Sequence, residues 1–162
     1  MPVVTADPCR PQMQFTPAHL KATCALGLAS AVITALPCAV PKAAALEPRD
    51  VALRTAQALK GAPYRWGATG PLAFDCSGLT QYAYRKAGKK LPRTAAAQFA
   101  FTQPITVQHR KPGDLVFFPR HGVIGHVALY AGNGYIWHAP KPGGHVRRER
   151  LWTERVAYHT VR

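Results

Sequence analysis

The spacing of apolar residues changes near residue 110, and this change restricts the fold more than any other feature of the chain. Upstream, apolar side chains recur every three or four residues, which predicts helices over residues 49–59, 76–86 and 94–101. Downstream, short runs rich in Val, Phe, Tyr and Trp are separated by glycine-containing turns, which is typical of strands. Helices followed by strands indicate an α+β fold with an antiparallel sheet.

The strands are expected to begin after a turn at residues 111–114, in which Asp114 is interpreted as a turn-capping residue. Two of them are joined by Gly132-Asn133-Gly134, which reads as a hairpin connection. The expected strands cover residues 115–118, 126–131 and 135–139, with one or two more among Val146 and residues 152–161.

The hairpin carries a histidine on each arm, His126 and His138. With a three-residue loop and Gly134 in the left-handed conformation, Ala128 lies opposite His138. The two histidines then share one face of the sheet as diagonal neighbours. A two-residue loop would place them on opposite faces. The side chains expected on the other, core-facing side are Val127, Leu129, Ile136 and Ala139.

The N-terminal segment has the order of a secretory signal. Twenty uncharged residues, 22–41, follow the basic Arg10 and Lys21, and a run of three alanines ending at Ala45 comes shortly after. We expect residues 1–45 to be a cleaved signal peptide and residues 46–162 to be one exported domain. A membrane anchor is the alternative, which the small residues and prolines of the run disfavour.

Cleavage would leave Cys76 as the sole cysteine, so the thiol is a buried residue, a link between two chains or a reactive nucleophile. The full chain has a formal charge of +14, and residues 46–162 keep 18 basic and six acidic residues. This excess predicts attraction to a polyanion. Export and the absence of a long basic run argue against nucleic acid, which leaves an anionic membrane or an acidic cell envelope with its anionic polymers. We expect a monomer.

The sharpest local motif is Phe74-Asp75-Cys76-Ser77-Gly78, at the expected start of the second helix. Unpaired N–H groups and the helix dipole favour a thiolate there, which predicts a lowered pKa for Cys76. A nucleophilic thiolate needs a base and an orienting group, which the two hairpin histidines supply. The alternative is a small cysteine packed at a helix end.

Zinc binding is a competing interpretation, since several histidines accompany Cys76. We expect no metal and no cofactor, because the chain lacks a Cys-x2-Cys or His-x3-His pair. The other histidines of residues 46–162 are expected at the surface or in loops, and these are His109, His121, His145 and His159.

Six motifs in order make the chain resemble the NlpC-type family of papain-like cell-wall peptidases, over about residues 50–160. They are Gly61-Ala-Pro-Tyr64-Arg-Trp66-Gly67, Asp75-Cys76-Ser77-Gly78-Leu79, Arg93-Thr94-x3-Gln98, Pro112-Gly113-Asp114-Leu-Val-Phe-Phe118, Gly125-His126-Val-Ala-Leu-Tyr130 and Trp137-His138-Ala139-Pro140.

The resemblance implies a reduced papain-like fold, in which the helix that carries the nucleophile packs on a small antiparallel sheet or half-barrel. It implies that Cys76 is the nucleophile, His126 the general base and acid, and His138 the residue that holds the His126 ring. The implied partner is a peptidoglycan stem peptide, cut between γ-D-glutamate and diaminopimelate or lysine. The residues implied to line the substrate are Tyr64, Asp75, Ser77 and Arg93.

Plainer roles stay open for several of these residues. Tyr64 and Trp66 would also suit aromatic core packing, Asp75 helix capping, and Arg93 a solvated charge or a structural ion pair. Two other functions also stay open: an amidase or acyl transferase with the same cysteine and histidine, and a non-catalytic basic module that binds cell wall.

Overall fold

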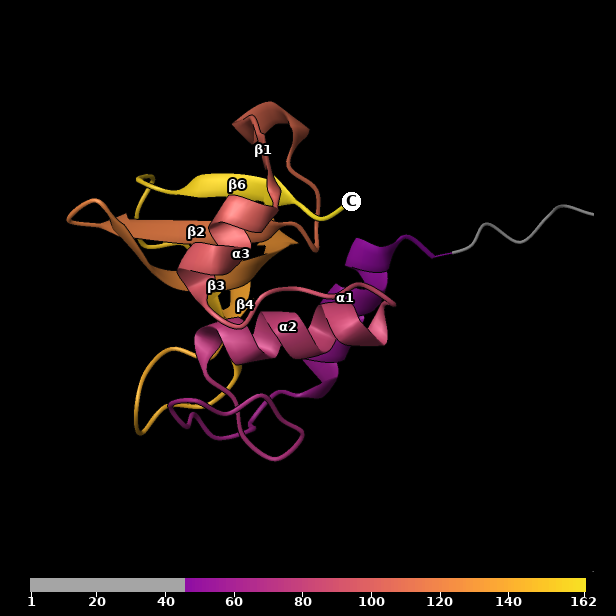
Figure 1. Ribbon diagram of the computed structural model, residues 1–162, viewed down its shortest axis with the longest axis vertical. Coiled ribbons are helices and arrows are strands. Elements are labelled where there is room, and N and C mark those ends of the chain that lie inside the picture. The colour runs from indigo at the N-terminus through magenta and orange to yellow at the C-terminus, as the bar shows by residue number, and fades with distance from the viewer. Residues whose placement is uncertain (1–45) are drawn as a thin grey trace, which may run out of the picture. The chain divides into compact units, whose positions relative to one another are not determined.

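The structure is a computed structural model that describes residues 46–162, in which three α-helices precede the strands of one sheet (Figure 1). The α+β class is therefore confirmed, while the signal-peptide prediction concerns residues 1–45 and lies outside the described residues. The helices are α1 (Pro48–Ala58), α2 (Cys76–Lys86) and α3 (Ala95–Phe101), and a short 3-10 helix η1 covers Val107–His109. The strands are β1 (Gln103–Ile105), β2 (Leu115–Arg120), β3 (Val123–Gly132), β4 (Tyr135–His138), β5 (Arg147–Arg150) and β6 (Ala157–Thr160).

Helix α2 has the bounds that the sequence predicts, because local signals fix both ends. The Asp75 side chain caps the first turn, with Oδ1 accepting a hydrogen bond from the Gly78 N–H at 2.7 Å. The helix ends before Gly88, whose φ of 76° is a conformation that glycine adopts without strain. Thr94 caps α3 in the same way as Asp75 caps α2.

Gly78 is required for a second reason, which is close packing rather than conformation. A Cβ at this position would lie 2.1 Å from the backbone oxygen of Ala68, so the loop before α2 touches the helix backbone directly. This loop contributes Tyr64 and Trp66 to the region around Cys76, and its approach to α2 therefore positions the candidate site.

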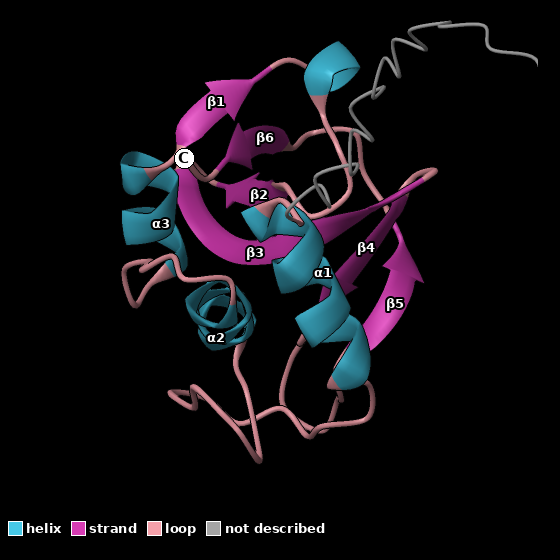
Figure 2. Cartoon of the chain, turned by 90° about the vertical axis from the view of Figure 1, so that its right-hand side faces the viewer, coloured by secondary structure: helices cyan, strands magenta, loops and turns pink. Residues whose placement is uncertain are grey.

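The six strands have the antiparallel order β1-β6-β2-β3-β4-β5. The three helices lie on one side of this curved sheet, as Figure 2 shows, and apolar side chains such as Leu79, Phe117 and Leu129 fill the space between the two layers. A smaller apolar cluster covers the opposite face of the sheet, and its buried members are Val116, Phe118, Ala128, Tyr130, Ile136 and Tyr158.

The β3–β4 hairpin has the predicted register but a different turn. Leu129 pairs with Trp137 and Tyr130 with Ile136, as predicted, whereas Gly132 pairs with Tyr135. The loop is therefore two residues long, Asn133-Gly134, both with positive φ, and a bulge at residue 131 restores the parity. His126 and His138 consequently share a face, as expected, although the bulge and the two-residue loop are the cause rather than a three-residue loop.

Two predictions about side-chain placement are wrong. Ile136 lies in the cluster on the face away from the helices, because it is two residues from His138 and period-2 alternation puts both on one side. His159 is buried rather than superficial, because β6 is inserted between β1 and β2. Its ring packs against Phe99 and Phe117, and its Nδ1 lies 3.1 Å from the Thr102 hydroxyl.

The predicted turn before β2 is confirmed, with Oδ2 of Asp114 accepting the Lys111 N–H at 2.7 Å. Strand β1 and helix η1 have no counterpart in the sequence prediction, and β5 covers a highly charged segment, residues 147–150, between the predicted ones. Within the described part of the chain, no helix is both long and apolar enough to cross a membrane.

Candidate active site

Cys76 is the first residue of α2 and is almost completely buried. The backbone N–H groups of Val127 and Ser77 lie close enough to its thiol to act on the thiol's pKa. Val127 directly follows His126 in β3, so the fold brings the cysteine at the helix start against the strand that carries the predicted base. The residues predicted to form the core of the site therefore converge from α2 and β3.

The thiol does not have the lowered pKa that its helix-start position predicts. Burial raises the pKa of Cys76, the neighbouring Asp75 carboxylate raises it further, and the N–H groups of Val127 and Ser77 only partly oppose these effects. The expectation of a thiolate in the resting protein is therefore wrong, because it considered the helix end alone and not the tertiary contacts that desolvate the thiol.

Asp75 forms one hydrogen-bonded group with two other predicted site residues, Ser77 and Arg93. Its carboxylate forms an ion pair with Arg93, whose Nη1 also donates to the Ser77 hydroxyl at 3.0 Å, and Oδ2 accepts the Gly67 N–H at 2.9 Å. Burial works to raise the pKa of Asp75, but the hydrogen bonds from Arg93 and Gly78 outweigh it and hold the pKa below its ordinary value. Helix capping and a structural ion pair are both confirmed here.

An open hollow of about 380 Å³ lies beside Cys76. Trp66 stands at this hollow with 82% of its surface exposed, so the core-packing interpretation is wrong for this residue. Tyr64 is half-buried and packs against the core, and burial followed by the nearby Cys76 and Asp75 raises the pKa of its hydroxyl. Further residues that line the hollow are Asp75, Ser77, Arg93, Ile124 and Gly125.

The two histidines form one end of a hydrogen-bonded chain. Nε2 of His126 lies 3.0 Å from Nδ1 of His138, and Nε2 of His138 lies 3.0 Å from Oε2 of Glu149 on β5. Arg147 binds the same carboxylate through Nε and Nη2. Sequence reasoning missed Glu149; the signal available was that it is the lone acid among four charged residues, 147–150.

Burial keeps the histidine pair neutral. Desolvation, with a smaller contribution from His138, lowers the pKa of His126 to about 3. The pKa of His138 is also lowered by burial, against the opposing effect of Glu149. Both rings are therefore uncharged at neutral pH, so His126 has a free lone pair with which to accept a proton.

Trp152 covers the outer side of this pair and was also missed. Its indole stacks on Phe118 with ring centroids 4.6 Å apart, and it lies 5.5 Å from the His138 ring. Two further hollows, of about 420 and 340 Å³, share Trp152, His126 and Gly125. Gly125 also lines the hollow beside Cys76, so all three hollows border this residue of β3.

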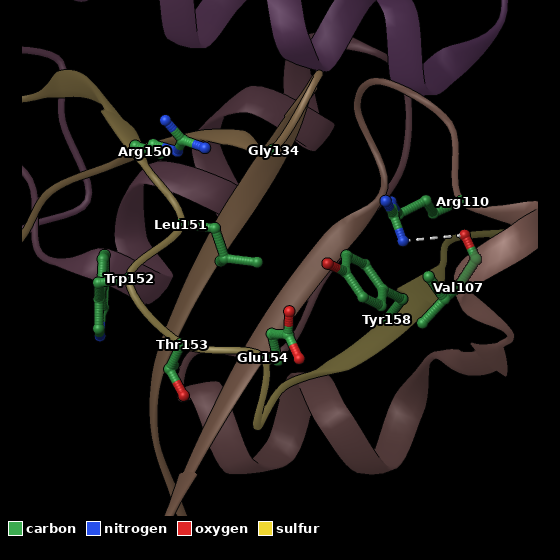
Figure 3. A pocket seen from close by; sticks show the side chains of 9 residues that line it. All are labelled: Val107, Arg110, Gly134, Arg150, Leu151, Trp152, Thr153, Glu154 and Tyr158. Carbon is green, nitrogen blue, oxygen red and sulfur yellow. Dashed lines mark hydrogen bonds between the residues drawn. The ribbon is translucent and has the colours of Figure 1, made fainter.

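A larger cavity of about 630 Å³ lies between β6 and the loop that follows β5 (Figure 3). Its wall includes the Arg110 side chain, which is placed over the rings of Tyr130 and Tyr158. This cavity contains neither Cys76 nor a histidine, and we place it outside the candidate active site. Among residues 46–162, no group of three or more His, Cys, Asp and Glu residues is placed to hold a metal ion.

A reduced papain-like α+β fold, with a cysteine at a helix start and two histidines on adjacent strands, defines the class of this protein. The family model described as "NlpC/P60 family" matches residues 61–162, and the chain belongs to this family. The resemblance that the sequence motifs indicate is thereby confirmed.

Two relatives of known name are both named as endopeptidases. The chain is 50% identical over 88 residues to "Probable endopeptidase p60" of Listeria monocytogenes, covering 54% of this chain and 18% of that protein. It is 40% identical over 98 residues to "Bifunctional muramidase/DL-endopeptidase CwlT" of Bacillus subtilis, covering 58% of this chain and 30% of that protein. It therefore spans less than a third of either relative.

One solved structure shows that the fold also occurs without catalysis. RipD of Mycobacterium tuberculosis superposes with a TM-score of 0.59 at 31% identity, covering 72% of this chain and 98% of that one. That protein is described as a non-catalytic NlpC/p60 domain protein adapted to peptidoglycan binding. Family membership therefore leaves the activity to be argued from the site.

Proposed function

We propose that this protein is a cysteine peptidase that hydrolyses peptidoglycan stem peptides. The observation that carries the proposal is the position of the Cys76 thiol against the backbone of Val127, next to His126. His126 uses Nε2 to contact His138, which leaves Nδ1 as the nitrogen that can accept the thiol proton.

The reaction begins from a neutral thiol and a neutral imidazole. The thiol proton passes to His126 while the sulfur attacks the scissile carbonyl carbon, so the thiolate is formed only as it is used. The oxyanion that develops lies at the start of α2, where the backbone N–H of Cys76 is available, and the protonated Tyr64 hydroxyl assists it. His126 then gives its proton to the leaving amine, and water hydrolyses the thioester.

We assign the γ-D-glutamyl bond to diaminopimelate or lysine as the bond that is cut, following the family resemblance. A relative named as a DL-endopeptidase supports this assignment. The group formed by Asp75, Ser77 and Arg93 lines the hollow beside the thiol, which is where a stem peptide would bind. Arg93 is half-exposed and keeps N–H donors that a substrate carboxylate would accept.

Two rival functions make different predictions. An amidase or acyl transferase would use the same residues but break another bond or transfer the acyl group. A non-catalytic wall-binding module is favoured by the likeness to RipD. Against it stand the presence of Cys76 and the hydrogen bond between the two histidines, which the mechanism uses to hold the His126 ring.

The decisive experiment is digestion of purified peptidoglycan by the wild-type protein and by Cys76→Ala, followed by mass analysis of the fragments. We expect wild type to release fragments ending in D-glutamate and fragments beginning with diaminopimelate or lysine, and Cys76→Ala to release none. Fragments cut at another bond would support the amidase. Equal release by both proteins, or none by a folded wild type that still binds wall, would reject the peptidase.

We further propose that residues 1–45 direct export and are removed near Ala45. N-terminal sequencing of the protein recovered outside the cytoplasm tests this. A new terminus close to Leu46 supports it, whereas an intact N-terminus in the membrane fraction supports the anchor.

The positive charge is proposed to hold the protein near anionic wall polymers. Within residues 46–162, Asp75 and Glu149 are already bound to arginines and Asp114 is buried, so few acids remain to offset the surface bases. Binding to purified wall should weaken as salt rises above about 0.15 M, where charges more than roughly 8 Å apart are screened. Salt-independent binding would contradict this role.

A further inference from the structure

One carboxylate oxygen of Glu149 contacts two different side chains. Oε2 lies 3.0 Å from Nε2 of His138 and 2.8 Å from Nε of Arg147. The contact crosses from β5 to the paired strand β4, where Arg147 lies opposite His138 and Glu149 lies opposite Ile136. All three polar side chains therefore project from the same face of this strand pair.

The carboxylate is ionised in this arrangement. Partial burial works to raise the pKa of Glu149, but the hydrogen bonds from Arg147 and His138 hold it below its ordinary value. An ionised carboxylate only accepts hydrogen bonds and never donates them. The nitrogen of His138 that faces Glu149 must therefore carry a hydrogen.

The position of this hydrogen on His138 also fixes the position of the hydrogen on His126. A neutral imidazole has one N–H and one lone pair, so His138 with a hydrogen on Nε2 has its lone pair on Nδ1. That nitrogen lies 3.0 Å from Nε2 of His126, which must then be the donor. His126 is neutral as well, so its lone pair is on Nδ1, the nitrogen left for Cys76.

We propose that Glu149 is a positioning residue that selects the tautomers of both histidines, so that His126 presents an unprotonated Nδ1 to the Cys76 thiol. The inference rests on the proposed function in taking His126 as the base. Without an acceptor at position 149, His138 is free to carry its hydrogen on Nδ1 and donate to His126. His126 would then hold its own hydrogen on Nδ1 and could not accept the thiol proton.

Two substitutions distinguish the need for a hydrogen-bond acceptor at position 149 from the need for a negative charge there. Glu149→Leu removes the acceptor, and we expect a fall in kcat of about 10- to 100-fold with little change in KM, because only a proton-transfer step is affected. Glu149→Gln keeps an oxygen that can accept from His138 and should retain kcat within about fivefold of wild type. The matched control is Glu154→Gln, an exposed acid on the neighbouring loop, which should behave as wild type.

The tautomers themselves are read from the 15N chemical shifts of the imidazole nitrogens in the wild-type protein and each variant. We expect both rings of wild type to be protonated on Nε2, and His138 of Glu149→Leu to shift toward Nδ1 protonation. A wild-type His138 protonated on Nδ1, or a Glu149→Leu variant with unchanged tautomers and kcat, overturns the proposal. The spectra need no substrate, so they test Glu149 even if peptide hydrolysis is not the reaction.

Discussion

The imidazole rings of His126 and His138 meet edge to face, with centroids 5.2 Å apart and Nε2 of the first 3.0 Å from Nδ1 of the second. His138 is only 2% exposed, so this contact is made away from water. A buried hydrogen bond of this kind fixes the orientation of the His126 ring, because an unsatisfied polar group there would be costly. The relationship gives His138 a defined role that mutation can test.

His138→Ala should reduce kcat without abolishing it. Removing the orienting residue from a nucleophile–histidine triad costs up to about 10⁴ in kcat when that residue is a charged carboxylate. Because His138 is a neutral partner, we expect a fall of about 10- to 1000-fold, with substrate binding largely retained. His138→Asn, whose amide oxygen can accept from His126, should keep more activity than His138→Ala. Equal activity of wild type and the folded Ala variant would contradict the role.

The start of α2 at Cys76 and the common face of the two histidines could be predicted because their signals are local. Asp75 and Gly88 mark the two ends of α2, and alternation along the hairpin puts His126 and His138 on one side. The exact turn could not be predicted, since a bulge and a two-residue loop give the same parity as a three-residue loop.

Features that depend on distant pairing could not be predicted. Glu149 lies in an edge strand without an apolar residue, so no periodic pattern marks it, and its partner is identified only by pairing with β4. His159 is buried because β6 lies between β1 and β2, which the order of elements along the chain does not reveal. The pKa of Cys76 likewise depends on burial in the folded protein, which the local sequence does not show.

Gly78→Ala should destabilise the protein by about 1–3 kcal/mol, because the new Cβ would lie 2.1 Å from the Ala68 backbone oxygen and one backbone must move. Thermal unfolding should therefore show a Tm lowered by roughly 4 °C or more. Gly125→Ala is the matched control, since a Cβ there meets nothing within 4 Å. If Gly125→Ala had a lower Tm than Gly78→Ala, the close approach of the loop to α2 would be misassigned.

The low pKa of His126 should make the protein less stable in acid. Its pKa is about 3 in the folded protein and near 6.5 in the unfolded chain, so below pH 6.5 the unfolded state binds a proton that the folded state does not. The contribution to stability is complete above pH 6.5 and is lost as the pH falls toward 3. Between pH 7 and 4.5 we expect a loss of about 1–3 kcal/mol from this residue.

The measurement is urea unfolding of wild type and His126→Gln at several pH values. The variant lacks this titration, so the stability difference between the two proteins should shrink or reverse in favour of the variant as the pH falls. His138 and His159 titrate in both proteins and largely cancel from the comparison. If the free energies of unfolding of the two proteins changed equally with pH, His126 would have an ordinary pKa. The lowered pKa that keeps the histidine pair neutral would then be contradicted.

The raised pKa of Cys76 predicts that the resting protein holds a thiol rather than a thiolate at neutral pH. The ultraviolet absorbance of the thiolate, taken as the difference between wild type and Cys76→Ser, should rise only above the pKa of an ordinary cysteine, about 8.5. The subtraction cancels any other cysteine of the chain. A preformed thiolate–imidazolium pair would instead absorb well below neutral pH and would lose the absorbance in His126→Gln. In the first case His126 takes the thiol proton during attack on the substrate. In the second case the proton would already be on His126 before the substrate binds.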